Sequence, residues 1–147
     1  MLLSNDGKWG PHINSICKKA NTTLGFKRRN LYNCPKEFKE VAYFALVRSK
    51  IEYASCIWNP YLQKDINQLE SIQNRGARFV CHNYNWNNSV TELKHTLGWN
   101  TLEQRRTNAC LCMFYKIVNN EVAINMDEHL DRSSTSTRRN QSQHRYL

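Results

Sequence analysis

The feature that most constrains this chain is an apolar stretch at residues 35–60, PKEFKEVAYFALVRSKIEYASCIWNP. Pro35 suits the first turn of a helix, because the N–H that proline lacks has no helical partner there. Apolar residues then recur at spacings of three and four, and Phe44 and Val47 add apolar surface on a second side. We therefore expect a central helix over residues 35–57, buried on more than one face, with the rest of the chain packed around it.

Four further segments show helical periodicity, at residues 11–29, 65–82, 90–97 and 101–119. Pro11 favours a helix start, and the strings SVTE at 89–92 and TLEQ at 101–104 fit capping boxes. Gly98 is a suitable stop for the short fourth helix. No stretch alternates as a strand would, so the predicted fold class is all-α, with about five helices around the central one.

The length of 147 residues fits one domain with a modest core, which we place at residues 1–131. Residues 132–147 contain almost no apolar side chains and cannot bury enough surface to offset the entropy of ordering. They are predicted to be a disordered basic tail.

The longest unbroken apolar run, 41–47, is far shorter than the roughly 18 residues that span a bilayer, and the N-terminus does not look like a signal peptide. We expect a soluble intracellular protein, cytoplasmic or nuclear, with no membrane partner. Its six cysteines are then expected to be free thiols, packed mostly as small apolar groups.

The net charge of +9 is concentrated at the two ends of the chain. Residues 1–60 carry +6, residues 61–131 carry −1 and residues 132–147 carry +4. Between Gly7 and Lys36 there are seven basic residues and no acidic one. Such a segment creates a positive potential in any fold, so a polyanion is the natural partner to consider.

The known signatures of catalytic and cofactor sites are missing from the sequence. There is no Gly-rich phosphate loop, no G-x-S-x-G, no H-E-x-x-H and no Asp-Asp pair. Cys110 and Cys112 are two residues apart on a predicted helix, so they point about 200° apart and cannot share a metal. We predict no catalytic residue, no metal and no cofactor.

Four strings together resemble the region that follows the polymerase palm in jockey-like non-LTR retrotransposon reverse transcriptases. They are HINSICKKANTTLGFKRRNL, NCPKEFKEVAYFALVRSKIEYASCIWNPY, DINQLESIQNRGARFV and LGWNTLEQRRTNACLCMFYKIVNN. The resemblance runs from about Lys8 to Ala123. Its most specific parts lie at residues 24–30, 51–61 and 97–106.

Two positions depart from the pattern of that family, which usually has proline where Ser49 stands and alanine where Gly76 stands. The first departure is expected to remove a kink from the central helix. Glycine inside a helix costs about 1 kcal/mol relative to alanine, so Gly76 marks either a weak point or a close crossing of two helices.

The resemblance implies the helical thumb and connection, which grip the template and primer while the palm holds paired aspartates and two magnesium ions. This chain would then be a fragment of an RNA-directed DNA polymerase without its catalytic palm, and not an enzyme by itself. A thumb holds RNA or an RNA–DNA hybrid by phosphates and 2′-hydroxyls rather than base edges. The candidate contacts are Lys18, Lys19, Thr22, Lys27, Arg28, Arg29 and Asn30.

Two alternatives remain open from the sequence. The basic residues at the end of the first helix suit the negative end of its dipole, and they need no other role. The chain can also be a helical protein–protein interaction module with no nucleic-acid role, whose exposed apolar surface meets a polymerase palm or another protein. A complete enzyme is the interpretation that the sequence favours least.

Overall fold

The computed structural model describes residues 8–85 and 87–124, and in this part of the chain every regular element is a helix. The chain divides after Leu111, within its last helix, into two compact units. The predicted domain end at residue 131 and the predicted tail at 132–147 lie outside the described residues.

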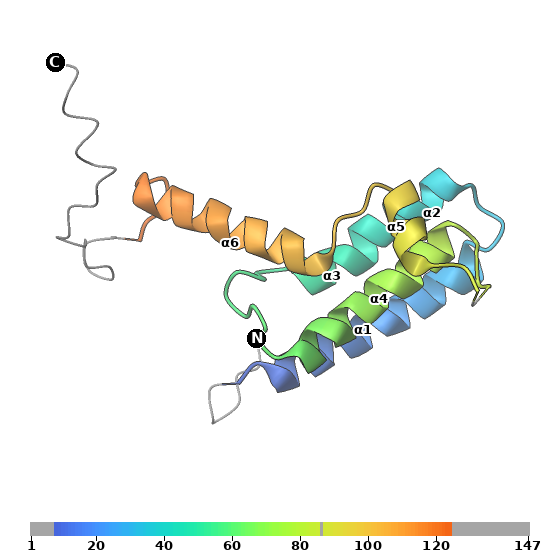
Figure 1. Ribbon diagram of the computed structural model, residues 1–147, viewed down its shortest axis with the longest axis horizontal. Helices are drawn as coiled ribbons and strands as arrows, with labels where there is room; N and C mark the ends of the chain where they lie inside the picture. The colour runs from blue at the N-terminus through green and yellow to red at the C-terminus, as the bar shows by residue number, and fades with distance from the viewer. Residues whose placement is uncertain (1–7, 86, 125–147) are drawn as a thin grey trace, which may run out of the picture. The chain divides into compact units, whose positions relative to one another are not determined.

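The helices follow one another in the predicted order (Figure 1). Their bounds are α1 Gly10–Asn30, α2 Lys36–Tyr43, the π-helical turn η1 Phe44–Arg48, α3 Ser49–Glu52, α4 Gln63–Val80, α5 Val90–Thr96 and α6 Leu102–Val118. The backbone stays helical from α2 through η1 to α3, so these three form one run, 36–52. The described chain therefore holds five helical segments, and the all-α fold class is confirmed.

Side-chain caps start the last two helices where the sequence predicted them. The Ser89 hydroxyl accepts the N–H of Glu92 at 3.5 Å. Thr101 and Gln104 form a full capping box, because the Gln104 N–H donates to the Thr101 hydroxyl at 3.1 Å while the Thr101 N–H donates to the Gln104 Oε1 at 3.3 Å. After α5, Gly98 has a φ of +65°, the left-handed conformation that ends many helices.

The prediction for the central helix was wrong in its end and in its burial. The run ends at Glu52, because Tyr53 leaves the helical conformation with a ψ of 121° and Ala54 takes a φ of +52°. Burial on more than one face is also wrong, since Phe38 is 69% exposed and Val41 is 65% exposed. One stripe alone enters the core. It consists of Lys39, Tyr43, Val47, Arg48 and Ile51.

The π-helical turn explains how that stripe stays in line. Lys39, Tyr43, Val47 and Ile51 are each four residues apart, and in a regular α-helix each such step would rotate the side chain by about 40°. At η1 the Ser49 N–H donates to the Phe44 carbonyl, five residues earlier, so the turn is wider than an α-helical turn. The wider turn compensates for the rotation and keeps all four side chains toward the core.

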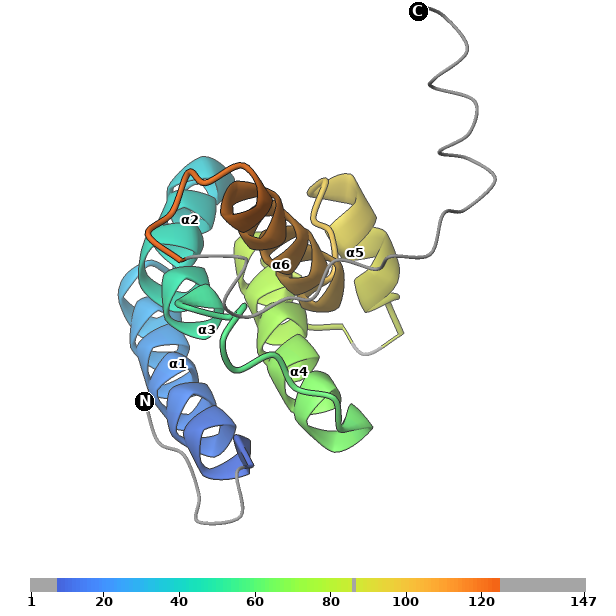
Figure 2. The same ribbon diagram turned by 90° about the vertical axis from the view of Figure 1, so that its left-hand side faces the viewer.

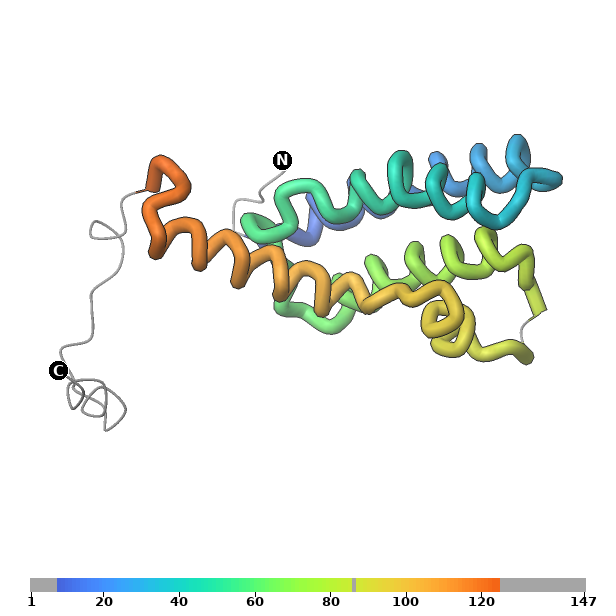
Figure 3. The backbone as a smooth tube through the Cα atoms, turned by 90° about the horizontal axis from the view of Figure 1, so that it is seen from above, coloured from blue at the N-terminus to red at the C-terminus, as the bar shows by residue number. Residues whose placement is uncertain are grey.

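The element at the centre of the fold is α4, not the run 36–52. Nine of its residues are buried, and it contacts α1, α2 and α5. It lies between α1 and α5 in Figure 2, while Figure 3 shows the run 36–52 lying along α1. The core fills the space among these helices. Its fully buried members include Ile13, Ala20, Tyr43, Val47, Trp58, Leu69, Ile72 and Leu102.

Gly76 lies at the closest crossing in this core. A Cβ atom added to Gly76 would lie 2.3 Å from the Tyr43 Cε2 atom and 2.8 Å from Cδ2, which no packing tolerates. Because Gly76 of α4 has no side chain, the Tyr43 ring of α2 can lie against the α4 backbone. Of the two interpretations left open by the sequence, the close crossing is confirmed.

Polar contacts position the first turns of α6 in the larger unit. The Leu102 N–H donates to Glu70 Oε1 at 2.6 Å, so a carboxylate of α4 lies at the positive end of α6. The Arg105 guanidinium pairs with the Glu52 carboxylate, with Nη2 2.9 Å from Oε2. This pair raises the pKa of Arg105 through its side-chain hydrogen bond.

The six cysteines are free thiols, as predicted, but most of them do not pack in the core. Cys17 alone is buried, four others are half-buried and Cys112 is exposed. The expectation that most of them fill small apolar spaces was wrong.

Candidate nucleic-acid interface

The seven candidate residues lie on α1, but they do not form one patch. The core side of this helix is a stripe formed by Ile13, Cys17, Ala20 and Leu24. Successive residues rotate by about 100°, so the candidates are distributed around the rest of the circumference. Lys18 and Thr22 line one hollow, whereas Arg28 lines another.

The cluster at the end of α1 divides in the same way. Lys27, Arg28 and Arg29 all lie in its last turn, where positive charge compensates the helix dipole. Lys27 is half-buried, with its Nζ 5.4 Å from the centroid of the Phe26 ring. Arg29 and Asn30 are exposed and line neither hollow. Of this cluster, Arg28 is the member that lines the second hollow.

The first hollow is a shallow groove that we name the lysine groove. It is lined by Ser15, Lys18, Lys19, Thr22, Thr23 and Lys50. Lys50 comes from α3 and reaches α1, where its Nζ donates to the Thr23 hydroxyl at 2.7 Å. The two threonine hydroxyls donate to the carbonyls of Lys18 and Lys19 at 3.0 Å, so Thr22 keeps two lone pairs for a ligand and Thr23 keeps the one that Lys50 does not use.

A second hollow extends the lysine groove and shares Lys19 and Lys50 with it. It adds Ile16, Ser49 and Tyr53. Neither hollow is lined by an aspartate or a glutamate. Three ammonium groups, several hydroxyls and no carboxylate form a surface that attracts an extended polyanion, because each phosphate can meet a positive charge and a polar neighbour.

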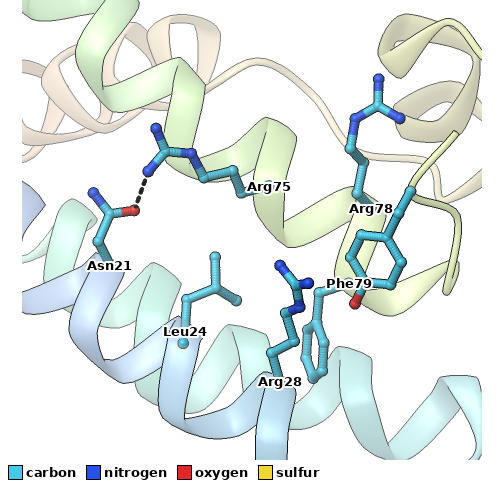
Figure 4. A pocket seen from close by; sticks show the side chains of 8 residues that line it. Asn21, Leu24, Arg28, Arg75, Arg78 and Phe79 are labelled. Carbon is cyan, nitrogen blue, oxygen red and sulfur yellow. Dashed lines mark hydrogen bonds between the residues drawn. The ribbon is translucent and has the colours of Figure 1, made fainter. Parts of the chain in front are cut away.

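The second site of positive charge is a deeper hollow between α1 and α4, which we name the arginine pocket (Figure 4). It has a volume of about 440 Å³. Its lining residues are Asn21, Leu24, Gly25, Arg28, Arg75, Arg78, Phe79 and Tyr84. Arg75 reaches across from α4, and its Nη1 donates to the Asn21 Oδ1 at 2.9 Å. The pocket contains three guanidinium groups and no carboxylate.

Sequence reasoning missed Lys50, Arg75, Arg78 and Tyr84. Lys50 belongs to the segment that was expected to be buried on several sides, and Tyr84 lies in a stretch that reads as a loop. A usable signal was present on α4, because Arg75 and Arg78 are three residues apart and so lie on one face. That α4 faces α1 could not be obtained from the sequence.

Two further arginines are buried and cannot meet a polyanion. Arg48 is 9% exposed, and its guanidinium carbon lies 4.0 Å from the Phe44 ring centroid and 4.8 Å from that of Trp99. Arg106 is 1% exposed, and its Nε donates to Asn59 Oδ1 at 3.3 Å. Burial lowers the pKa of both groups. The net charge of the sequence therefore overstates the charge of the surface.

Residues 8–85 and 87–124 contain neither a metal-ligand cluster nor a membrane-spanning helix. No three His, Cys, Asp or Glu side chains there gather closely enough to hold a metal ion. None of the helices in these ranges is long and apolar enough to cross a membrane.

Comparison with known proteins gives no independent identification. No protein-family model, no curated protein and no solved structure matches the chain.

Proposed function

We propose that this chain is a helical nucleic-acid-gripping module of a non-LTR retrotransposon reverse transcriptase, which binds RNA or an RNA–DNA hybrid through phosphate contacts. The observation that carries the proposal is the lysine groove, where Lys18, Lys19 and Lys50 meet among hydroxyl groups without a carboxylate. The sequence resemblance to the thumb and connection of these polymerases supports the same function.

The chemistry of the groove suits the backbone of a nucleic acid better than its bases. Lysine ammonium groups are mobile point charges that neutralise phosphates without reading sequence. Hydroxyls such as those of Thr22 and Thr23 can accept hydrogen bonds from the 2′-hydroxyls of an A-form helix. Binding is therefore expected to depend strongly on salt and weakly on sequence.

The proposal assigns grip and not catalysis to this chain. Nucleotide transfer by two magnesium ions needs clustered carboxylates, whereas Glu52 pairs with Arg105 and Glu70 pairs with Lys94. Purified chain with magnesium, nucleotides and a primed RNA template is expected to extend no primer. Template-dependent extension would contradict the assignment.

The decisive experiment measures how salt changes the affinity for a labelled RNA–DNA hybrid, by fluorescence anisotropy on the full chain. Replacement of Lys18, Lys19 and Lys50 by glutamine should reduce the slope of log K against log salt by roughly 2 to 3, because about three phosphate contacts are lost. The matched control replaces Lys36, Lys64 and Lys116, which are exposed and lie outside the groove. Equal effects of the two triple variants would refute the groove as the interface.

A second candidate function, a protein–protein interaction module, is favoured by a different observation. Several large apolar side chains are exposed, and Phe38, Tyr53 and Tyr61 are each more than two-thirds exposed. Exposed apolar side chains mark a binding surface for another protein where they form a contiguous patch. If this is the function, hybrid binding should be weak and the lysine replacements should change it no more than the control replacements do.

A further inference from the structure

We propose that the arginine pocket binds a single nucleotide, with its phosphate on the guanidinium groups and its base against the aromatic and aliphatic lining. This site is separate from the lysine groove and does not depend on the function proposed for that groove. A nucleotide combines one compact anion with one flat apolar ring, and the pocket offers a surface for each.

The walls of the pocket are fixed by the core. Leu24 of α1 and Phe79 of α4 are 5% and 2% exposed, so they are core side chains whose edges reach the pocket. Gly25 adds no side chain to the wall, and a Cβ atom placed there would lie 3.9 Å from the Arg29 Nη1 atom. The volume of about 440 Å³ falls in the range of small-ligand sites, roughly 300 to 1,000 Å³.

Neutral groups position two of the guanidinium groups of the pocket. Arg75 donates to the Asn21 amide oxygen at 2.9 Å, and Arg28 lies against the Tyr84 ring. These contacts orient Arg75 and Arg28 but do not neutralise their charge. No carboxylate lines the pocket, so an anion entering it meets the positive charges of Arg28 and Arg75.

A cation–π contact between Arg28 and Tyr84 marks the place for the base. The Arg28 guanidinium carbon lies 4.5 Å from the centroid of the Tyr84 ring. Unpaired bases bind proteins by stacking on tyrosine rings and on arginine planes, and this pair offers both kinds of surface. Leu24 and Phe79 supply the apolar contact, which inorganic phosphate could not use.

Calorimetric titration of the full chain with adenosine 5′-monophosphate tests the pocket. Ribose 5-phosphate, which keeps the anion and lacks the base, should bind about tenfold more weakly if the base stacks. Arg75→Gln should weaken binding about tenfold, and Tyr84→Leu should remove the difference between the two ligands. The control Lys64→Gln changes the same charge on the same helix outside the pocket, and it should bind as the unaltered chain does.

The source of the nucleotide is distinguished by a second pair of ligands, a blunt hybrid duplex and the same duplex with one unpaired terminal nucleotide. Tighter binding of the overhang, lost in Tyr84→Leu, assigns the pocket to an unpaired nucleotide of a strand. Binding of the monophosphate with no advantage for the overhang assigns it to free nucleotides.

Three results would overturn the proposal. They are equal binding of adenosine 5′-monophosphate and ribose 5-phosphate, an Arg75→Gln variant that binds as Lys64→Gln does, and equally tight binding of a phosphotyrosine peptide. The variant that lacks Lys18, Lys19 and Lys50 should still bind the monophosphate. If this variant binds the monophosphate but not the hybrid, the pocket functions independently of the lysine groove, so the two proposals can fail separately.

Discussion

The run 36–52 and α4 are helical segments of nearly equal length, and the more apolar of the two buries less. Nine of 17 residues are apolar in the run, against six of 18 in α4. Yet the run buries five residues and α4 buries nine. The difference is one of position, because α4 has helices on several sides whereas the run turns one stripe inward.

Some of the buried residues of α4 are not apolar. Gln73 is fully buried, and its Nε2 donates to the Asn100 carbonyl at 2.7 Å. Gly76 is buried because Tyr43 occupies the place of a side chain. Apolar composition therefore indicates which segments can form a core, while the number of neighbouring elements decides which residues are in it.

The largest expected effect tests α4 as the centre. Leu69→Ala removes a fully buried side chain among three packed helices and should lower the free energy of unfolding by about 2 to 5 kcal/mol. Urea denaturation followed by circular dichroism measures it. Val41→Ala, on the exposed side of the run, is the comparison. If the two substitutions lower the free energy of unfolding equally, α4 is not more central to the core than the run 36–52.

Replacement by alanine should change the free energy of unfolding in opposite directions at two helical glycines. Gly76→Ala should destabilise the fold by about 1 to 3 kcal/mol, because the new methyl group would overlap the Tyr43 ring. Gly25→Ala meets no close atom and should stabilise α1 by about 0.5 to 1 kcal/mol through helix propensity. Thermal unfolding of both variants measures the pair. If Gly76→Ala stabilised the fold instead, the close crossing of α4 and α2 at Gly76 would be wrong.

The α1 face of the core can be tested by its response to pH. Burial, with a smaller contribution from the charge of Asp65 on α4, raises the pKa of the Cys17 thiol from 9.0 to about 11. Above pH 9 the unfolded chain loses this proton while the folded chain keeps it, so stability falls as pH rises towards 11. The thiol should account for a loss of about 1 kcal/mol between pH 8 and pH 10.

Urea denaturation at the two pH values, repeated on Cys17→Ala, isolates this contribution. Other groups titrate equally in both chains, so the difference between their losses belongs to Cys17. An equal loss in the two chains would show that the thiol is in contact with water.

The smallest expected effect is at the exposed face of the run. Phe38→Ala should change the free energy of unfolding by no more than about 0.5 kcal/mol, because the ring is already 69% exposed. Urea denaturation beside Leu69→Ala measures it. A loss above 2 kcal/mol would mean that the ring is buried in solution. The run 36–52 would then be buried on more than one face, as the sequence predicted.

Local signals in the sequence predicted local structure well. The side-chain cap at Ser89, the capping box at Thr101, the stop at Gly98 and the start at Pro11 all describe groups within a few residues of one another. Such interactions depend little on the rest of the fold, so the helix order was predicted from them.

Contacts between distant segments could not be predicted in the same way. Lys50 and Thr23 are 27 residues apart, and Arg75 and Asn21 are 54 apart. Each pair exists because two helices cross at one register, which periodicity does not determine. The sequence therefore identified α1 as the basic helix but missed the residues from α3 and α4 that turn it into two concave surfaces.

The π-helical turn at Phe44–Arg48 makes the length of this segment as important as its side chains. Closing it to a regular α-helical turn without removing a residue would rotate α2 by about 100° relative to α3. Tyr43 and Ile51, eight residues apart, would then point about 80° away from each other and could not both face the core. Deleting one residue here would leave them seven apart and only about 20° out of line, so an alignment gap of one residue at this position would mark the loss of the wide turn and not a different packing.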